Sequence, residues 1–207
     1  MRYISHYPDA TNDDILNAIA DIYGMNKNQI VVGNGAAELL YAICRLPGYT
    51  GAFVPAPGFS EYKAALEASR IPVRDIYYRP REDEHGKPYF EVPYLALETF
   101  AAELKGQDGR IIVFLGNPNN PDGTLLDKNH IRTIASMLKD ANSLLVIDES
   151  FIDFVGNDTL QDNEYSMRSL VNEFDNIIVV HSFTKFCAVP GLRIGAAFSN
   201  PLIIEQL

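Results

Sequence analysis

The sequence predicts an α/β protein, a three-layer sandwich built around a mainly parallel, doubly wound sheet. Short apolar, β-branched runs alternate along the chain with segments whose apolar residues recur at helical spacing. The runs Ile111–Leu115 and Ile177–Val180 are apolar at every position, as expected for strands that are covered on both faces. The 207 residues, 47% of them hydrophobic, are enough to bury a sizeable core.

The expected strands follow from the apolar runs. They are Ile30–Val32, Ala52–Pro55, Val73–Tyr77, Ile111–Leu115, Leu144–Ile147, Ile177–Val180 and Ile194–Phe198. Between the third and fourth strands, Arg79–Pro88 is charged and rich in turn-forming residues, so we expect an exposed loop there.

The expected helices fill the gaps between the strands. In the first, Ile15, Ala18, Ile19 and Ile22 recur at helical spacing, and Gly24 ends the helix. The others are Ala36–Arg45, Ser60–Ala68, Tyr94–Leu104, Lys128–Ala141 and Tyr165–Glu173. Because ligands of doubly wound sheets bind at the carboxyl ends of the strands, we expect the chemistry at those ends.

The composition restricts which binding partners and which cellular compartment we expect. The formal net charge of −10 argues against a nucleic acid or an anionic membrane as partner, although a few local donors can still hold a phosphate. Cys44 and Cys187 form no metal-ligand or disulfide framework, which favours a reducing cytoplasm. We expect no transmembrane helix, since no apolar stretch reaches about 18 residues, and no signal peptide at the start.

The strongest candidate for chemistry is residues 182–195, directly after the run Ile177–Val180. A lysine at position 185 could reach a pocket at the sheet edge, where a desolvated amine becomes a nucleophile for an aldehyde. The hydroxyls of Ser182 and Thr184 and the guanidinium of Arg193 could hold a phosphate. These residues alone, however, favour a surface lysine and a structural arginine.

Other strand ends carry weaker signals. Asp148 ends an apolar strand and reads by itself as a solvated carboxylate or a helix cap. Residues 116–123 read as a turn, and Phe59 as an aromatic packed under a loop. The strand, glycines and helix start around Gly35 could cradle a phosphate with backbone N–H groups, or form a plain turn. Tyr7 alone is an ordinary loop aromatic.

Together, these segments resemble the class I/II aminotransferases, which depend on pyridoxal 5′-phosphate (PLP) and have fold type I. The pattern Ser-x-Thr-Lys followed by Pro-Gly-Leu-Arg-x-Gly resembles the family's lysine segment. Five further segments occur in the family's order: residues 7–8, 33–37, 55–62, 117–121 and 148–151. The resemblance implies that the chain is most of the PLP-binding large domain, with the C-terminal small domain and the extreme N-terminal segment missing.

The resemblance implies contacts with the PLP ring. Lys185 would form the Schiff base. Asp148 would pair with the pyridine nitrogen and keep it protonated, so that the ring acts as an electron sink. Asn120 would hydrogen-bond the 3′-oxygen, although Asp122 stands where the family usually has threonine. Phe59 would stack on the ring.

The resemblance also implies contacts with the PLP phosphate. These would come from Ser182, Thr184 and Arg193, and from the backbone amides of Gly35, Ala36 and Ala37. In relatives, the tyrosine at the position of Tyr7 reaches the phosphate of the neighbouring subunit, which implies a homodimer with shared active sites. Tyr62, Glu149 and His181 are expected to be structural.

Within the family, the segments are most similar to those of threonine-phosphate decarboxylases of the corrinoid pathway, and next to those of histidinol-phosphate aminotransferases. The latter usually carry tyrosine where Phe151 stands. Both groups act on phosphorylated amino compounds, so we expect a small anionic amino-acid substrate. Decarboxylation and transamination stay open, because the family's carboxylate-binding arginine lies beyond position 207; for the same reason we expect little turnover from the chain alone.

Two other classes of function remain as alternatives. A nucleotide-binding domain using Gly33 and Gly35 would leave the lysine segment unexplained, and the sequence lacks both Gly-x-Gly-x-x-Gly and a Walker lysine. The second alternative is a non-catalytic fragment of the PLP fold that serves as a binding module. No metal site is expected, because the histidines show no metal-ligand spacing.

Overall fold

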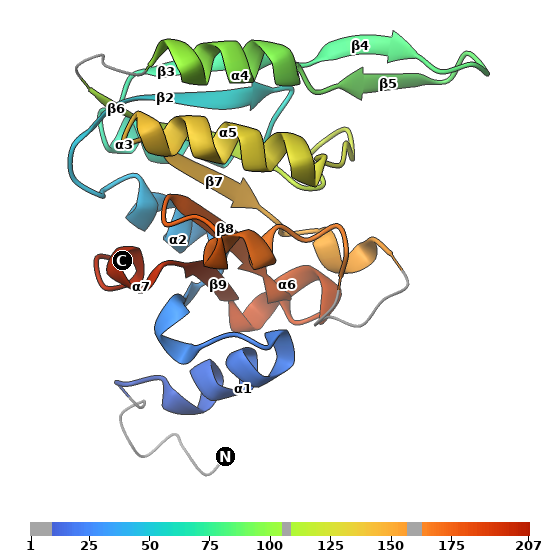
Figure 1. Cartoon of the computed structure of the whole chain (residues 1–207). Helices are drawn as coiled ribbons and strands as arrows, with labels where there is room; N and C mark the ends of the chain where they lie inside the picture. Colours follow the sequence, from blue (N-terminus) through green and yellow to red (C-terminus); the bar gives the residue numbers. More distant parts are fainter. Residues whose placement is uncertain (1–9, 105–108, 157–162) are drawn as a thin grey trace.

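A 7-stranded sheet forms the centre of the computed structural model, which describes residues 10–104, 109–156 and 163–207 (Figure 1). The strand order is β1-β9-β8-β7-β6-β2-β3. The strands are β1 (Ile30–Asn34), β2 (Tyr49–Ala56), β3 (Val73–Tyr77), β6 (Arg110–Gly116), β7 (Leu144–Asp148), β8 (Ile177–Ser182) and β9 (Ile194–Ser199). The pairs from β8 to β3 are all parallel, whereas β9 is antiparallel to both β1 and β8. The predicted mainly parallel sheet is therefore confirmed.

Helices cover both faces of this sheet and make it the middle of three layers (Figure 1). The helices are α1 (Asp13–Tyr23), α2 (Ala36–Ile43), α3 (Ser60–Ala68), α4 (Tyr94–Glu103), α5 (Lys128–Asp140), α6 (Phe183–Phe186) and α7 (Pro201–Ile204). Successive strand residues point to opposite faces. Val113 and Leu115 of β6 accordingly belong to the core under α4 and α5, while Ile112 and Phe114 belong to the core under α2 and α3.

All seven expected strands are present, and β3 and α3 have the predicted bounds. The first helix ends as predicted: Gly24 adopts the left-handed conformation with φ 63°, and its N–H donates to the carbonyl of Ala20. α6 and α7 were not predicted, because four residues are too few to show a helical period. Among the described residues, no helix is long and apolar enough to cross a membrane.

The expectation of a loop at Arg79–Pro88 is wrong. The segment contributes to an antiparallel hairpin of β4 (Arg79–Glu82) and β5 (Pro88–Glu91), apart from the main sheet (Figure 1). Asp83 stabilises the turn by accepting hydrogen bonds from the backbone N–H groups of residues 85 and 87. All four residues of β4 are exposed, so the strand lacks the apolar alternation by which strands are recognised.

The helix predicted over Tyr165–Glu173 is also wrong, since only Arg168–Asn172 is helical, as the 3₁₀ helix η3. The buried carboxylate of Glu149 explains the difference. It accepts hydrogen bonds of 2.6 Å from the N–H of Met167 and from Oγ of Ser166. These contacts draw the start of the segment toward β7, and a local pattern cannot reveal a partner so distant in the sequence.

Replacing Leu138 by alanine should lower the free energy of unfolding by about 2–5 kcal/mol, because it leaves a cavity in a closely packed core. Leu138 of α5 is 0% exposed, whereas Leu95 of α4 is 77% exposed. The matched variant Leu95→Ala should therefore stay within about 0.5 kcal/mol of the unsubstituted chain. Urea unfolding followed by circular dichroism measures both, and equal losses would contradict the placement of α5.

Candidate active site

Four loops meet at the carboxyl edge of the parallel strands. Backbone and side-chain hydrogen bonds join each loop to the next. Nδ2 of Asn119, after β6, donates to the carbonyl of Pro57, after β2, over 3.0 Å. The N–H of Asn117 donates to the carbonyl of Asp148 at 2.8 Å, and that of Glu149 to Val180 at 2.7 Å. The loops after β2, β6 and β7 are therefore joined to one another and to the last residues of strand β8.

Asp148 is the last residue of β7 and is buried, with 6% of the residue exposed. Two donors hold it in place: Oη of Tyr62 lies 3.0 Å from Oδ2, and the N–H of Ser150 lies 2.9 Å from Oδ1. Buried charges require such partners. Sequence reasoning placed Tyr62 only in the core. Its ring does stack on Phe114, but its hydroxyl orients the candidate catalytic carboxylate.

Lys185 lies in α6, just after β8, and its Nζ stands 4.2 Å from the centre of the Phe151 ring. Partial burial lowers the pKa of the Lys185 amine; the carboxylate of Asp148 opposes this shift and the charge of Arg193 adds to it. A lowered pKa leaves more of the amine unprotonated, which is the form that attacks a carbonyl carbon. The structure therefore brings Lys185 and Asp148 into one electrostatic environment.

A second group of polar atoms gathers at the ends of β8 and β9. Strand pairing sets Ser182 opposite Gly195, and Gly195 opposite Gly33 of β1. Oγ of Ser182 and Oγ1 of Thr184 lie 2.8 Å apart, and both residues are buried. The hydroxyls are thus held together just before Lys185 in the sequence, which directly follows Thr184.

The amino end of α2 lies close to this group of polar atoms. An added Cβ on Gly195 would lie 2.5 Å from the nitrogen of Ala36, so only glycine permits this approach. Gly35 has φ 80°, and an added Cβ there would lie 2.7 Å from Nη2 of Arg193. The guanidinium therefore stands directly at the amino end of α2, where the N–H groups of Ala36 and Ala37 lie. Such a helix end with an arginine suits a phosphate.

The remaining predicted site residues are Phe59, Asn120 and Tyr7, and the structure describes the surroundings of the first two. Phe59 is half-buried and contacts Tyr62 edge-on, with ring centres 5.6 Å apart. Asn120 is half-buried on the loop after β6, and no hydrogen bond to its side chain occurs within the described ranges. Asp122 accepts from Nδ2 of Asn119 and from the N–H of Thr124, so it stabilises that loop. Tyr7 lies outside the described residues.

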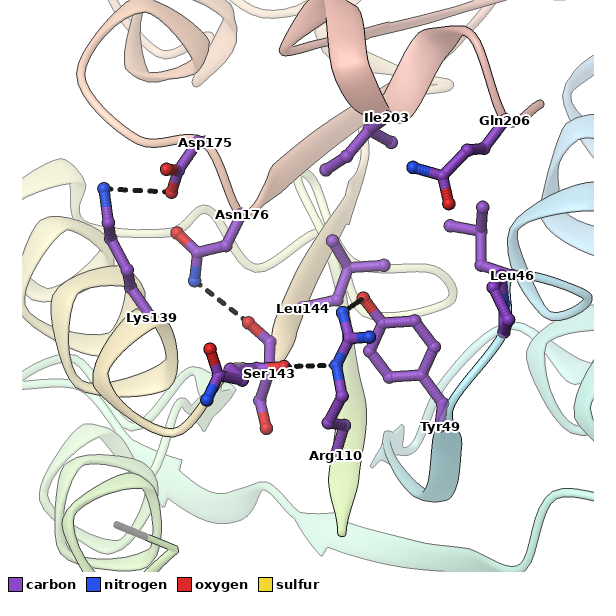
Figure 2. A pocket seen from close by; sticks show the side chains of 12 residues that line it. Leu46, Tyr49, Arg110, Lys139, Ser143, Leu144, Asp175, Asn176, Ile203 and Gln206 are labelled. Atoms are coloured by element: carbon purple, nitrogen blue, oxygen red, sulfur yellow. Dashed lines mark hydrogen bonds and ion pairs between the residues drawn. The ribbon is translucent and has the colours of Figure 1, made fainter. Parts of the chain in front are cut away.

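A cavity of about 330 Å³ lies at the opposite edge of the sheet, around the first residues of β2, β6 and β7 (Figure 2). Its charged side chains are engaged with neighbouring groups. Arg110 donates to the carbonyl of Asn142 and to Oη of Tyr49, and Lys139 pairs with Asp175 (Figure 2). Since ligands of such sheets bind at the carboxyl edge, this cavity is not the candidate site.

Comparison with known proteins identifies the family. The family model for aminotransferase class I and II matches residues 1–207. The chain belongs to the class I and II aminotransferase family. A histidinol-phosphate aminotransferase from Sinorhizobium meliloti, solved in complex with pyridoxal 5′-phosphate, has the same fold: the TM-score is 0.74 at 25% identity, over 97% of this chain and 50% of that one. The cofactor of this class I and II aminotransferase chain is PLP.

Two curated relatives are informative. The adenosylcobalamin biosynthesis bifunctional protein CobDQ of Leptospira interrogans is 34% identical over 97% of this chain and 21% of its own length. A protein of Caldanaerobacter subterraneus, named "Putative threonine-phosphate decarboxylase", is 32% identical over 99% of this chain and 51% of its own length. This class I and II aminotransferase chain thus spans about half the length of the second relative and about a fifth of the first.

Lys185 should react with trace acetic anhydride at a lower pH than an ordinary lysine, because its pKa is lowered by burial. Lys63 is the internal control: it lies 2.7 Å from the carboxylate of Asp75, and this hydrogen bond raises its pKa. Mass spectrometry of the PLP-free chain across a pH series measures both midpoints. A midpoint for Lys185 at or above that of Lys63 would contradict the environment described here.

Proposed function

We propose that this chain forms the PLP-binding part of an enzyme that acts on a phosphorylated amino acid, in the manner of a threonine-phosphate decarboxylase. Lys185 would hold PLP by a Schiff base. The bound cofactor supplies an electron sink for cleavage of a bond at the substrate Cα. The chain's own residues would position the cofactor, shield the site from water and hold protons.

The residues around β7 would hold the cofactor ring. Asp148 would keep a proton on the pyridine nitrogen, because the residue is 6% exposed and its carboxylate is oriented by Tyr62. The amide of Asn120 makes no hydrogen bond to another described residue, so it would be available to the 3′-oxygen, and Phe59 would cover one face of the ring. The contact of Phe59 with Tyr62 supports this arrangement, since it places the aromatic ring beside the residue that holds Asp148.

The residues around β8, β9 and α2 would hold the phosphate. Arg193, Ser182 and Thr184 supply side-chain donors, and the N–H groups of Gly35, Ala36 and Ala37 supply backbone donors. The close approach of Arg193 to Gly35 supports this assignment. The guanidinium of Arg193 stands beside the amino end of α2, and no carboxylate in the described structure pairs with it. Tyr7 would complete the phosphate site of a second subunit in a homodimer with shared sites.

One observation carries the proposal: the Lys185 amine, whose pKa is lowered, interacts electrostatically with both the buried carboxylate of Asp148 and the guanidinium of Arg193. That arrangement suits an aldehyde cofactor with a ring nitrogen at one end and a phosphate at the other. It is not expected for a nucleotide-binding domain, whose phosphate loop needs no amine nucleophile.

The substrate assignment rests on resemblance. Phe151 stands where histidinol-phosphate aminotransferases usually carry tyrosine, and the two curated relatives above bear names from cobalamin biosynthesis and threonine-phosphate decarboxylation. The second candidate is histidinol-phosphate aminotransferase, favoured by the likeness to the Sinorhizobium meliloti structure. Both reactions use the same cofactor-holding residues and differ in which Cα bond stands perpendicular to the ring.

Borohydride reduction of the PLP-saturated chain should place the pyridoxyl label on Lys185, because its amine has a lowered pKa and interacts with the carboxylate of Asp148. Peptide mapping by mass spectrometry locates the label. The Lys185→Arg variant is the control and should carry none. A label on another lysine, or none on a folded and saturated sample, would reject the assignment.

O-Phospho-L-threonine should release carbon dioxide and yield the matching phosphorylated amino alcohol when the full-length protein is loaded with PLP. Histidinol phosphate with 2-oxoglutarate is the matched assay for transamination, read as glutamate formed. Faster transamination would replace the decarboxylase with the second candidate. PLP binding at Lys185 with neither product would instead favour a non-catalytic binding module.

A further inference from the structure

His181 and Asp153 form a buried pair that the proposed chemistry does not use. Nε2 of His181 lies 2.9 Å from Oδ2 of Asp153, and the two side chains are 1% and 4% exposed. His181 is in β8 next to Ser182, but on the opposite face of the strand. Asp153 is in the 3₁₀ helix η2 (Ile152–Phe154), shortly after Asp148.

This burial is costly, so a simple packing role does not explain it well. Nδ1 of His181 and Oδ1 of Asp153 are buried, and neither has a hydrogen-bond partner within the described ranges. Polar atoms that are buried without hydrogen-bond partners destabilise the fold, so we expect the pair to have a further role. An apolar pair of similar size would fill the same space without that cost.

The pair links the turn after β7 to strand β8, which is directly followed by the helix that carries Lys185. Asp153 sits in a turn that begins with Phe151, whose ring lies against the Lys185 amine at 4.2 Å. The same turn contacts α6 again through Phe154, whose ring meets that of Phe186 edge-on at 5.5 Å. In the part of the chain that the structure describes, no other side-chain hydrogen bond or ion pair links residues 151–154 to β8 or α6.

We propose that Asp153 and His181 are positioning residues that hold the Phe151 ring against the Lys185 amine and so cover one side of this partly exposed group. The pair touches neither cofactor nor substrate and acts through Phe151. This inference rests on the proposed function, because the position of the amine matters only if Lys185 carries PLP. It extends that function by assigning a role to the turn after Asp148.

Other groups that face the pair come from the surrounding elements. Oη of Tyr23, from α1, lies 3.2 Å from the same Nε2 of His181. The guanidinium of Arg168, from η3, lies over the Tyr23 ring at 4.2 Å. Tyr23 therefore gives His181 a second neighbour, and His181 keeps a polar contact when Asp153 is replaced.

The test compares Asp153→Ala, which removes the link, with Asp153→Asn, which keeps an oxygen that can accept from Nε2 of His181. Two readouts are used: the pH midpoint for acetylation of Lys185 in the PLP-free chain, and the dissociation constant of PLP. In Asp153→Ala the midpoint should move up toward that of an ordinary lysine, because more water reaches the amine. PLP should bind roughly five-fold more weakly, the effect of one net hydrogen bond. Asp153→Asn should stay close to the unsubstituted chain.

Ser199→Ala is the matched control. Oγ of Ser199 is buried and donates to the carbonyl of Ile177 over 2.6 Å, at the far end of β8. This variant loses a buried hydrogen bond on the same strand, so it should lose stability yet keep the Lys185 midpoint and the PLP affinity. Equal shifts in Ser199→Ala and Asp153→Ala would reduce the pair to a merely structural role.

A second pair of variants covers the case in which Asp153→Ala does not fold. The amide nitrogen of His181→Gln reaches the place of Nε2, while that of His181→Asn reaches only the place of Nδ1. We expect the Lys185 midpoint to rise in His181→Asn and to stay in His181→Gln. An unchanged midpoint in folded Asp153→Ala or His181→Asn overturns the inference. Absence of a borohydride label on Lys185 of the unsubstituted chain rejects the proposed function instead, and the PLP-free midpoints still test the pair.

Discussion

The close approach of β9 to the start of α2 is the constraint on which the candidate site depends. Gly195 leaves no room for a side chain beside the nitrogen of Ala36, and Gly35 leaves none beside the guanidinium of Arg193. This contact brings the amino end of a helix to the strand end that carries Ser182 and, just after it, Lys185. The antiparallel insertion of β9 between β1 and β8 makes the approach possible.

The second organising feature is a pair of adjacent carboxylates with different partners. Because consecutive residues at the end of β7 point to opposite faces, Asp148 meets Tyr62 of α3, and Glu149 meets Ser166 and Met167 before η3. Glu149 is fully buried and engaged by protein donors, so it stabilises the fold. Asp148 lies at the rim, where a cofactor nitrogen would reach it.

Much of the fold follows from local patterns, since strands buried on both faces and amphipathic helices each leave a periodic signal. The two errors have different causes. The hairpin of β4 and β5 is exposed and lacks alternation, and the segment before η3 is held by Glu149, a partner far away in the sequence. Of the candidate site, Lys185, Asp148, Asn120 and Arg193 could be predicted from the sequence because the motifs that contain them resemble those of the family.

The sequence by itself therefore determined the α/β class, the strand ends at which chemistry is expected and the family to which those motifs belong. Only the tertiary structure decided which side chains contact one another. The hydroxyl of Tyr62 binds Asp148, the Phe151 ring lies against Lys185, and Asp153 lies beside His181. The physical reason is that such contacts join residues from different elements. Their distances depend on how the whole sheet and its helices pack, which no local window of sequence contains.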